Sequence, residues 1–406
     1  MRRLRLTALV WLFASAAWAQ TPRPDALYVN PAALVTASRL VGLAGASTGL
    51  SENTESIPTN YAAAAGRHPR RDRNWDWDYT LAFLTAPVAS MRDVENDGSG
   101  EQTIAPVEGQ VGITVQIQRF GVGVYSRAST RGLCLTEACE PGMEQLEAQS
   151  VSGALVAGYS FLEDQLLIGA GLNMAFASFQ YEKTTRGYLG LSLGLGVNWR
   201  PHTLPLRLGV SYVSQSNADP QFDLDANPTL AGRPLYQRAV SPPKLSFGAC
   251  TRVGEEAWRF NRQSPSAIRE HPSQENLARV PHDVIEDWSP PGAVLVCAQL
   301  DVVFPVENAT TLTPFLLGGA APAAGAYTTF IPRLGVEWEA ITRLLRLRAG
   351  TYLHPAQIEG STPRPHFTTG LELRVVRLLG ADWSLSASAN LAPRLFTMSF
   401  GIGWWL

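Results

Sequence analysis

From residue 75 onward the chain alternates strictly between apolar and polar side chains. Between Tyr188 and Trp199 every second residue is Leu, Val or Trp, and the residues between them are Gly, Ser or Asn. A period of two is that of an extended strand with one apolar and one polar face. This stretch is 12 residues long, whereas strands in globular proteins are usually about 5 to 6 residues. The pattern predicts an all-β fold with unusually long strands.

Two architectures would remove the apolar face of such strands from water: a soluble sandwich and a membrane barrel. A sandwich covers its outside with charge, but only 17% of this chain is Asp, Glu, Lys or Arg, against about 25% in typical soluble domains. Strands that cross a bacterial outer membrane need about 9 to 11 residues and alternate between apolar outward and polar inward side chains. We therefore predict an antiparallel transmembrane β-barrel in the bacterial outer membrane, surrounded by lipid.

Fourteen segments carry the alternation, and outer-membrane barrels usually have an even number of strands. The predicted strands are 75–84, 110–117, 120–127, 150–161, 166–181, 187–199, 205–214, 243–253, 293–304, 326–340, 346–354, 367–377, 383–392 and 396–406. The phase flips between Ile117 and Phe120, which predicts a tight turn at Gln118-Arg119, with a single bulged strand as the alternative.

The connections between these strands are alternately short and long, and short turns belong on the periplasmic side. The polar segment 255–291 breaks this rule, as either a periplasmic excursion or a missed strand pair.

The positions of the Trp residues support this orientation, because the amphipathic Trp ring favours the membrane surface. Seven Trp fall at the predicted periplasmic ends: Trp75, Trp77, Trp199, Trp338, Trp383, Trp404 and Trp405.

Residues 1–19 have the pattern of a secretory signal peptide. Three Arg precede an apolar run, and Ala17-Trp18-Ala19 forms a cleavage site. Without this segment the chain has 30 basic residues, because three of the 33 are removed, against 35 acidic ones, a net charge of −5. This acidic balance argues against a nucleic-acid partner.

Four cysteines lie in this exported chain, and an oxidising compartment favours disulfides. Cys134 and Cys139 are predicted to close a small loop. Cys250 and Cys297 share the inward phase of two sequential strands, which predicts a cross-strand disulfide or two neighbouring thiols in the lumen. Because no cluster of His and Cys accompanies them, we predict neither a metal site nor a cofactor.

Charged residues with inward phase gather late in the chain, and we predict that they line the lumen. On adjacent strands Glu337 can pair with Arg346 or Arg348, and Glu372 with Arg348. The set can be a constriction that selects solutes or a structural network in the wall, and we favour the network. Its members are Asp301, Arg333, Glu337, Arg346, Arg348, Glu372 and Arg374.

The last strand alternates from Phe396 to the final residue, Leu406. It resembles the C-terminal strand by which the barrel-assembly machinery recognises bacterial outer-membrane proteins. Such strands usually end in Phe, so the terminal Leu is a departure. The resemblance implies the assembly machinery as a partner.

Four motifs carry a family resemblance: Arg39 to Ala46, Ser51-Glu52, Asn60 to Ala63 and the strand entry Ser241 to Gly248. They resemble motifs of the FadL and PorV superfamily of fourteen-stranded barrels. The family's N-P-A element is altered at Tyr61, and its intact form, Asn30-Pro31-Ala32, lies before the Gly-rich block. The C-terminal half resembles myxobacterial members, in Pro332 to Trp338 and Leu347 to Tyr352.

This resemblance implies that residues 20–74 form a plug or periplasmic segment and that 75–406 form the barrel. In FadL-type proteins hydrophobic substrates diffuse through, whereas PorV-type proteins shuttle secreted cargo. We therefore expect a transport channel for hydrophobic or small solutes, or else a non-transporting scaffold that binds other envelope proteins in secretion or motility. No His stands beside a recognisable nucleophile, so we expect no enzyme, although His354 and His366 share one outer loop as some barrel hydrolases require.

Overall fold

The computed structural model describes most of the barrel and parts of the region before it. The described residues are 26–29, 37–52, 54–66, 75–85, 96, 103–134, 145–181, 184–223, 229–230, 233–234, 236, 238–254, 257–261, 294–311, 323–342, 344–356, 358, 361–378 and 381–404. The predicted signal peptide, Asn30-Pro31-Ala32, Cys139, Trp405, Leu406 and most of 255–291 lie outside these residues.

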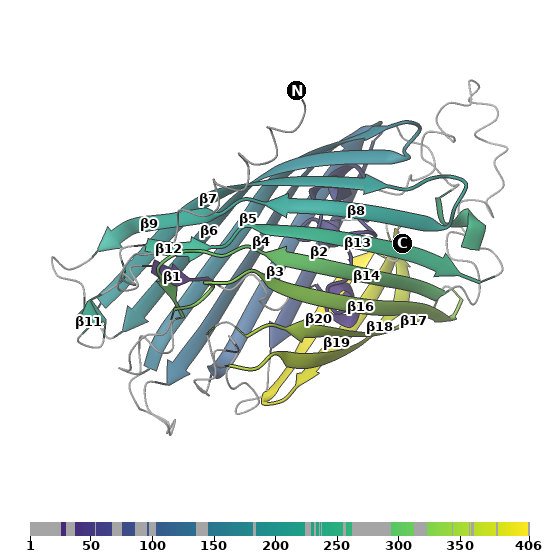
Figure 1. Ribbon diagram of the computed structural model, residues 1–406. Helices are drawn as coiled ribbons and strands as arrows, with labels where there is room; N and C mark the ends of the chain where they lie inside the picture. The colour runs from purple at the N-terminus through teal and green to yellow at the C-terminus, as the bar shows by residue number, and fades with distance from the viewer. Residues whose placement is uncertain are drawn as a thin grey trace, which may run out of the picture.

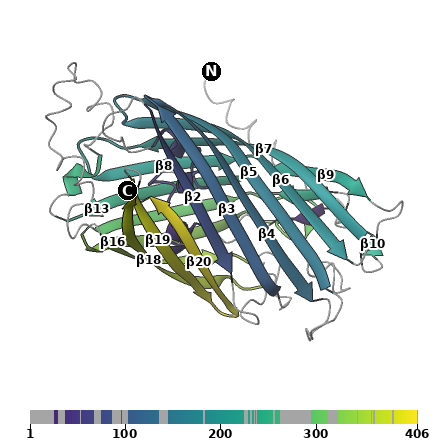
Figure 2. The same ribbon diagram turned by 180° about the vertical axis from the view of Figure 1, so that it is seen from behind.

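Fourteen long antiparallel strands form a closed barrel (Figures 1 and 2). The first of them, β2, pairs with both β3 and β20, the last, and this closes the wall. The strands are β2 (Trp75–Thr85), β3 (Thr103–Ile117), β4 (Phe120–Cys134), β5 (Gln145–Phe161), β6 (Leu166–Tyr181), β7 (Thr184–Trp199), β8 (Leu206–Val213), β13 (Lys244–Val253), β14 (Val294–Val303), β16 (Thr329–Ile341), β17 (Leu345–His354), β18 (Arg364–Leu378), β19 (Ala381–Ala392) and β20 (Leu395–Trp404).

This architecture confirms the predicted fold class and strand count. The two-residue turn at Gln118-Arg119 is also confirmed, because Ile117 pairs with Phe120 and Gln118 has a left-handed φ of 51°. The predicted strands were too short at one end of the barrel, where β3 begins at Thr103 rather than at 110. There the polar strand ends pair without the alternation that lipid imposes on one face.

Short strands complete the wall at the end opposite the C-terminus, the outer end. β1 (Ala26–Tyr28) runs parallel between β12 (Arg238–Ser241) and β15 (Ala309–Thr310). β9 (Ser216–Asp223) continues the line of β8 and pairs with β7 and β12. β10 (Thr229–Leu230) and β11 (Arg233–Pro234) pair only with each other, in a separate two-stranded sheet. None of these strands was predicted. Most have two to four residues, too few to show a period, and the eight-residue β9 (SNADPQFD) lacks the apolar alternation.

The described residues between β1 and β2 lie inside the barrel. They comprise 37–52 and 54–66, called here the inner segment, with the helix α2 (Ser38–Gly42) and the 3-10 helices η1 (Thr54–Ser56) and η2 (Tyr61–Ala65). Arg39, Glu55, Pro58 and Thr59 are half-buried, and every other residue of the inner segment is buried. A further 3-10 helix, η3 (Ala257–Asn261), follows β13 at the end that carries the C-terminus.

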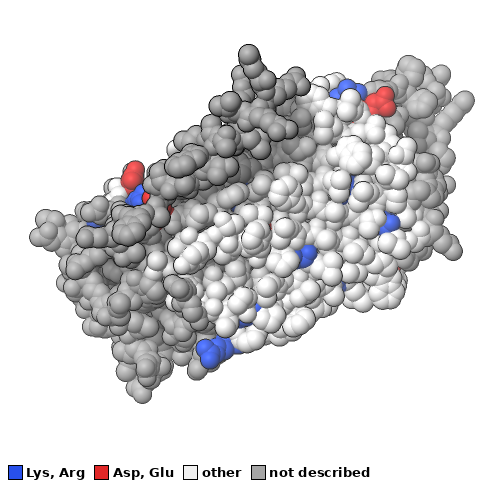
Figure 3. All heavy atoms as spheres, viewed as in Figure 1, with Lys and Arg blue, Asp and Glu red and all other residues white. Residues whose placement is uncertain are grey.

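The outer face of the wall is apolar. Leu191, Leu193 and Leu195 on β7 are 57%, 63% and 56% exposed. Figure 3 shows broad uncharged areas on the described wall, broken by a few isolated basic side chains. Exposed apolar surface of this extent is stable only against another apolar medium. This outer face is therefore the surface that contacts membrane lipid.

Exposed Trp side chains lie at one end of this apolar surface. Trp75, Trp77, Trp199 and Trp338 are between 37% and 45% exposed and stand at the ends of β2, β7 and β16 nearest the C-terminus. Trp383 pairs in register with Trp404 at the same end.

The helices in the described part of the chain are all too short to cross a membrane.

The lipid-facing surface yields a test of depth. Leu193 lies six residues before Trp199, about 20 Å along the strand, which places it near the middle of the bilayer. Leu193→Arg is expected to lower the free energy of unfolding by about 2 to 4 kcal/mol, and Leu204→Arg, in the exposed turn beyond the Trp side chains, by about 0 to 1. Guanidinium unfolding from lipid vesicles, followed by Trp fluorescence, measures both. Equal losses would contradict the placement.

Candidate functional site

The candidate site is the contact between the inner segment and the inner face of the wall. α2 contacts β17 to β20, η1 contacts β2 and β3, and η2 contacts β3 to β7. The stretch from Leu43 to Leu50 lies against β8, β13 and β16. The inner segment therefore contacts the wall around its circumference and occupies the lumen at this level.

Glycine on the inward face allows this contact. A Cβ built at Gly121 of β4 would overlap the carbonyl oxygen of Ala64, and one at Gly209 of β8 would overlap that of Thr48. Any side chain at these positions would push the inner segment away from the wall. The same close approach occurs at Gly169 with Tyr61, at Gly248 with Gly49 and at Gly335 with Leu43.

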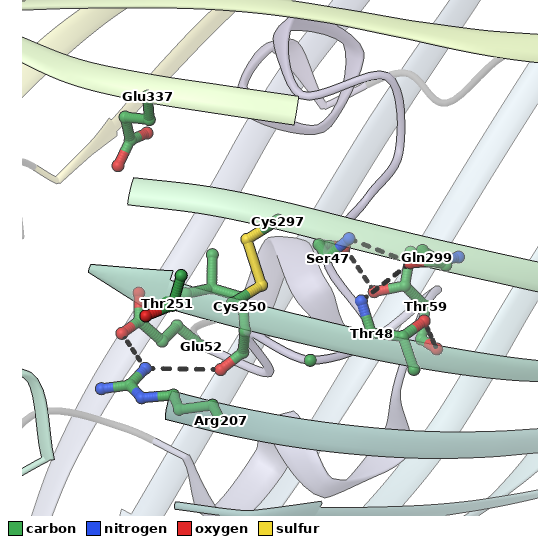
Figure 4. The surroundings of a disulfide bond; sticks show 12 residues. Ser47, Thr48, Glu52, Thr59, Arg207, Cys250, Thr251, Cys297, Gln299 and Glu337 are labelled. Atoms are coloured by element: carbon green, nitrogen blue, oxygen red, sulfur yellow. Dashed lines mark hydrogen bonds and ion pairs between the residues drawn. A yellow bond between two sulfur atoms is a disulfide. The ribbon is translucent and has the colours of Figure 1, made fainter. Parts of the chain in front are cut away.

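Polar side chains of the wall hold the backbone of the inner segment. The Gln299 Oε1 atom accepts hydrogen bonds from the amides of Ser47 and Thr48, both 3.0 Å long (Figure 4). Asp78 accepts from the Thr54 amide at 2.8 Å, and Asn198 donates to the Gly49 carbonyl at 2.6 Å. Turns without regular secondary structure leave such groups unpaired, so the wall supplies their partners.

Two further side chains of the inner segment fix the turn before η2. Asn60 caps η2 by accepting a hydrogen bond from the Ala62 amide at 3.0 Å, and its Nδ2 donates to the Thr48 carbonyl at 2.9 Å. The Tyr61 hydroxyl donates to Asn173 Oδ1 of β6 at 2.8 Å. Burial raises the pKa of Tyr61 to about 12, so its hydroxyl keeps its proton.

An ion network joins the inner segment to the late strands of the barrel. Arg39 forms two 3.0 Å hydrogen bonds to Glu337 and lies 3.5 Å from Glu52 and from Glu55. Burial disfavours the charge of Arg39, but the three carboxylates together hold its pKa well above the ordinary value. Arg348 bonds Glu337 at 2.6 Å, and it also pairs with Glu372.

Six of the seven sequence-predicted lumen residues carry inward ion pairs. Arg348 pairs with both Glu337 and Glu372, whereas Arg346 pairs with Glu339 at 3.4 Å and with Glu372 at 3.9 Å. Arg333 pairs with Asp301 at 2.8 Å and donates to the Ala44 carbonyl at 2.9 Å. Arg374 is half-buried beside the bulge that shifts the β18–β19 register.

Sequence inspection missed the three charges on the inner segment side of this network. Arg39, Glu52 and Glu55 are the only charged residues between 37 and 66. Isolated charges in a chain otherwise made of small and apolar residues are a signal that each has a partner. Asp78 and Arg207 were also missed, although the alternation of their strands directs both inward.

A polar cavity of about 40 Å³ lies where the inner segment meets β2 and β17 to β20. Its lining includes Ser38, Arg39, Glu55, Asp78 and Arg348. The buried Nη1 atom of Arg348 and the Ser38 hydroxyl have no hydrogen-bond partner among the described residues. A space of this size and polarity holds roughly two or three water molecules, which would supply the missing partners.

The predicted pair Cys250 and Cys297 forms a disulfide between directly paired residues of β13 and β14. Both sulfurs face inward and pack with Leu43, Ala46 and Leu50 of the inner segment (Figure 4). Cys134 ends β4, and its predicted partner Cys139 lies outside the described residues. No group of three or more potential metal ligands occurs among the described residues.

The glycine contacts generate a substitution test. Gly209→Val is expected to displace the inner segment while the barrel still closes, so that trypsin cuts after Arg39. Gly403→Val is the matched control, because a Cβ at Gly403 meets no atom within 4 Å and cleavage should stay at the wild-type level. Mass spectrometry of the fragments measures the cut. Equal cleavage in both variants would contradict the close packing.

Glu55 gives the contact a pH dependence. Burial raises its pKa to about 7, against the opposing effect of Arg39. Because the proton is bound more tightly in the folded state, the stabilisation is complete below about pH 4.5 and is lost as the pH rises through 7. Unfolding free energy should therefore fall by about 3 kcal/mol more between pH 4.5 and 8 in the wild type than in Glu55→Gln. Identical pH profiles would contradict this role.

The comparisons with known proteins bear on the fold. No protein-family model and no curated protein sequence matches the chain. Among solved structures, the CymD monoaromatic hydrocarbon channel superposes with a TM-score of 0.51 at 12% identity, covering 92% of this chain and 97% of that one. A Pseudomonas aeruginosa FadL homologue gives 0.49 at 12% identity, covering 91% and 96%. The Pseudomonas putida toluene transporter TodX gives 0.46 at 11% identity, covering 94% and 98%.

Three observations now agree: a closed barrel of fourteen antiparallel strands, an apolar outer face with Trp at one end, and superposition over nearly the whole length of a hydrocarbon channel. An apolar outer face on a closed barrel is stable only in lipid. The protein is therefore a β-barrel of the bacterial outer membrane with the fold of the CymD channel.

Proposed function

We propose that the protein is a transport channel for hydrophobic or small solutes and that residues 20–74 are its plug. The observation that carries the proposal is the glycine-rich inner wall. Fourteen strands enclose a space too wide for inward side chains of ordinary size to fill. Where the inner segment lies, inward-facing residues of the wall are Gly and leave room for it. The lumen is thus filled by a separate stretch of chain, which can leave it.

The anchoring of the inner segment also favours a removable plug. Its contacts with the wall include hydrogen bonds and ion pairs to polar side chains, beside apolar contacts such as those of Leu43 and Leu50 with the Cys250–Cys297 disulfide. Water can replace the polar partners when the segment moves. The proposal agrees with the function of CymD, a monoaromatic hydrocarbon channel whose fold this chain shares.

Two of the earlier predictions belong to this proposal. The charged residues of β14 and β16 to β18 line the plugged lumen and hold the plug, and they do not catalyse a reaction. The C-terminal strand is the part of the chain that the barrel-assembly machinery would recognise, and β20 presents its alternating face up to Trp404.

The alternative, a scaffold that binds envelope proteins, is favoured by one observation. The strands β3 to β7 have 15 to 17 residues, whereas about 9 to 11 suffice to cross the membrane. Their outer halves therefore extend beyond the lipid as a surface that a partner protein could contact. A scaffold would need no removable plug.

Deleting residues 20–70 while keeping the signal peptide separates the two functions. We expect the deleted barrel to pass toluene or arabinose into lipid vesicles at least about tenfold faster than the full chain, because the glycine wall is left uncovered. A folded barrel, shown by its resistance to SDS before heating, is the required control. If neither form passes either solute while the full chain holds a partner in pull-downs, the protein is a scaffold.

A further inference from the structure

One buried guanidinium connects the plug to a second element. Arg207 of β8 is 1% exposed. Its Nη1 pairs with the Glu52 carboxylate and donates to the Leu50 carbonyl, both in the inner segment (Figure 4). Its Nε donates to Asn261 Oδ1 at 2.9 Å and its Nη2 to the Phe260 carbonyl at 2.9 Å, both in η3. The same side chain thus holds the inner segment and η3 at once.

η3 is packed into the periplasmic mouth of the barrel. Phe260 is 3% exposed and lies in one apolar cluster with Leu43, Leu50 and the Cys250–Cys297 disulfide. The Arg207 guanidinium lies 3.9 Å from the centre of its ring, and that of Arg252 lies 4.9 Å from it. Both are cation–π distances. The Phe260 ring therefore contacts the periplasmic side of the inner segment.

Asn261 fixes η3 to the neighbouring turn of the wall. Its Nδ2 lies 3.0 Å from the Pro201 carbonyl and 2.8 Å from each of the Leu204 and Leu206 carbonyls. These carbonyls belong to the connection between β7 and β8 and to Leu206, the first residue of β8. The chain that leaves β13 thus reaches back across the mouth and is held by strands it does not follow.

Strand connection alone does not require this arrangement. Antiparallel neighbours such as β13 and β14 can be joined by about two to five residues, as β3 and β4 are here. Instead, the chain from Gly254 to residue 293 separates them, and its first part buries an aromatic ring and a hydrogen-bonded amide in the mouth. Burial of this kind indicates a function at the mouth.

We propose that η3 is a second closure of the channel, which holds the plug in place from the periplasmic side through Arg207. The inference rests on the proposed function, because a closure needs a channel to close. The plug cannot leave toward the periplasm until Phe260 and Asn261 leave the mouth, and Arg207 loses its two hydrogen-bond acceptors in η3 when they do. Release of η3 is therefore the step at which passage into the periplasm is controlled.

The test loosens η3 and leaves the contacts of Arg207 with the plug intact. The variant is Phe260→Ala with Asn261→Ala, in the full chain. The matched control is Thr251→Ala, which removes a 2.8 Å hydrogen bond to Pro205 in the same turn region. Folding is checked by resistance to SDS before heating. Two quantities are measured: arabinose flux into lipid vesicles and tryptic cleavage after Arg39.

We expect arabinose flux and cleavage after Arg39 each to be about tenfold higher in the Phe260→Ala, Asn261→Ala variant than in Thr251→Ala. A tenfold rise corresponds to a modest shift in the population of the closed state. In the chain lacking 20–70, the same two substitutions should raise flux further, because η3 obstructs the mouth by itself. Wild-type flux and cleavage in the full-length variant would overturn the proposal. If no form passes solute, the channel function fails, and the cleavage alone decides whether η3 holds the inner segment.

Discussion

The close approach of backbone to backbone inside the barrel is the constraint on which the rest of the structure depends. The carbonyls of Ala64 and Thr48 lie where a Cβ of Gly121 or Gly209 would be. Glycine therefore serves neither as a turn former nor as a bulge here. It provides room for a second stretch of chain against a wide wall, and this explains why the polar face of so many strands contains so little side chain.

Electrostatics complements this shape. Buried ions are costly unless each has its partner, and the inner segment brings one Arg and two Glu to a wall that carries Glu337, Glu372, Arg207 and Arg348. Two of these ion pairs, Arg39–Glu337 and Glu52–Arg207, form only when the inner segment is in place. Docking is thereby specific for one position of the segment, and the raised pKa of Glu55 makes that position sensitive to pH near neutrality.

Much of the architecture followed from period two alone, because lipid on one side and a polar lumen on the other enforce alternation. The fourteen strands, the turn after Ile117 and the inward phase of Cys250 and Cys297 belong to this part. The outer strand ends did not follow, since no lipid imposes a pattern there. β1 escaped detection because three residues show no period, and its place between β12 and β15 is set by contacts far apart in the sequence. The ion-pair partners of Arg39 and Glu55 could not be predicted for the same reason.

The proposed function requires that the inner segment closes the lumen and that it leaves when solute passes. A reversible cross-link tests this most directly. The Cβ of Ser38 lies 3.5 Å from the position a Cβ would take at Gly401, within the range of a disulfide. The double variant Ser38→Cys with Gly401→Cys would join α2 to β20 by a disulfide. Solute flux into vesicles would be measured before and after reduction. The wild-type chain, which lacks the two introduced cysteines, is the control for effects of the reductant itself. We expect flux to be abolished while the cross-link is intact and restored when it is reduced; equal flux in both states would show that the inner segment need not move for solute to pass.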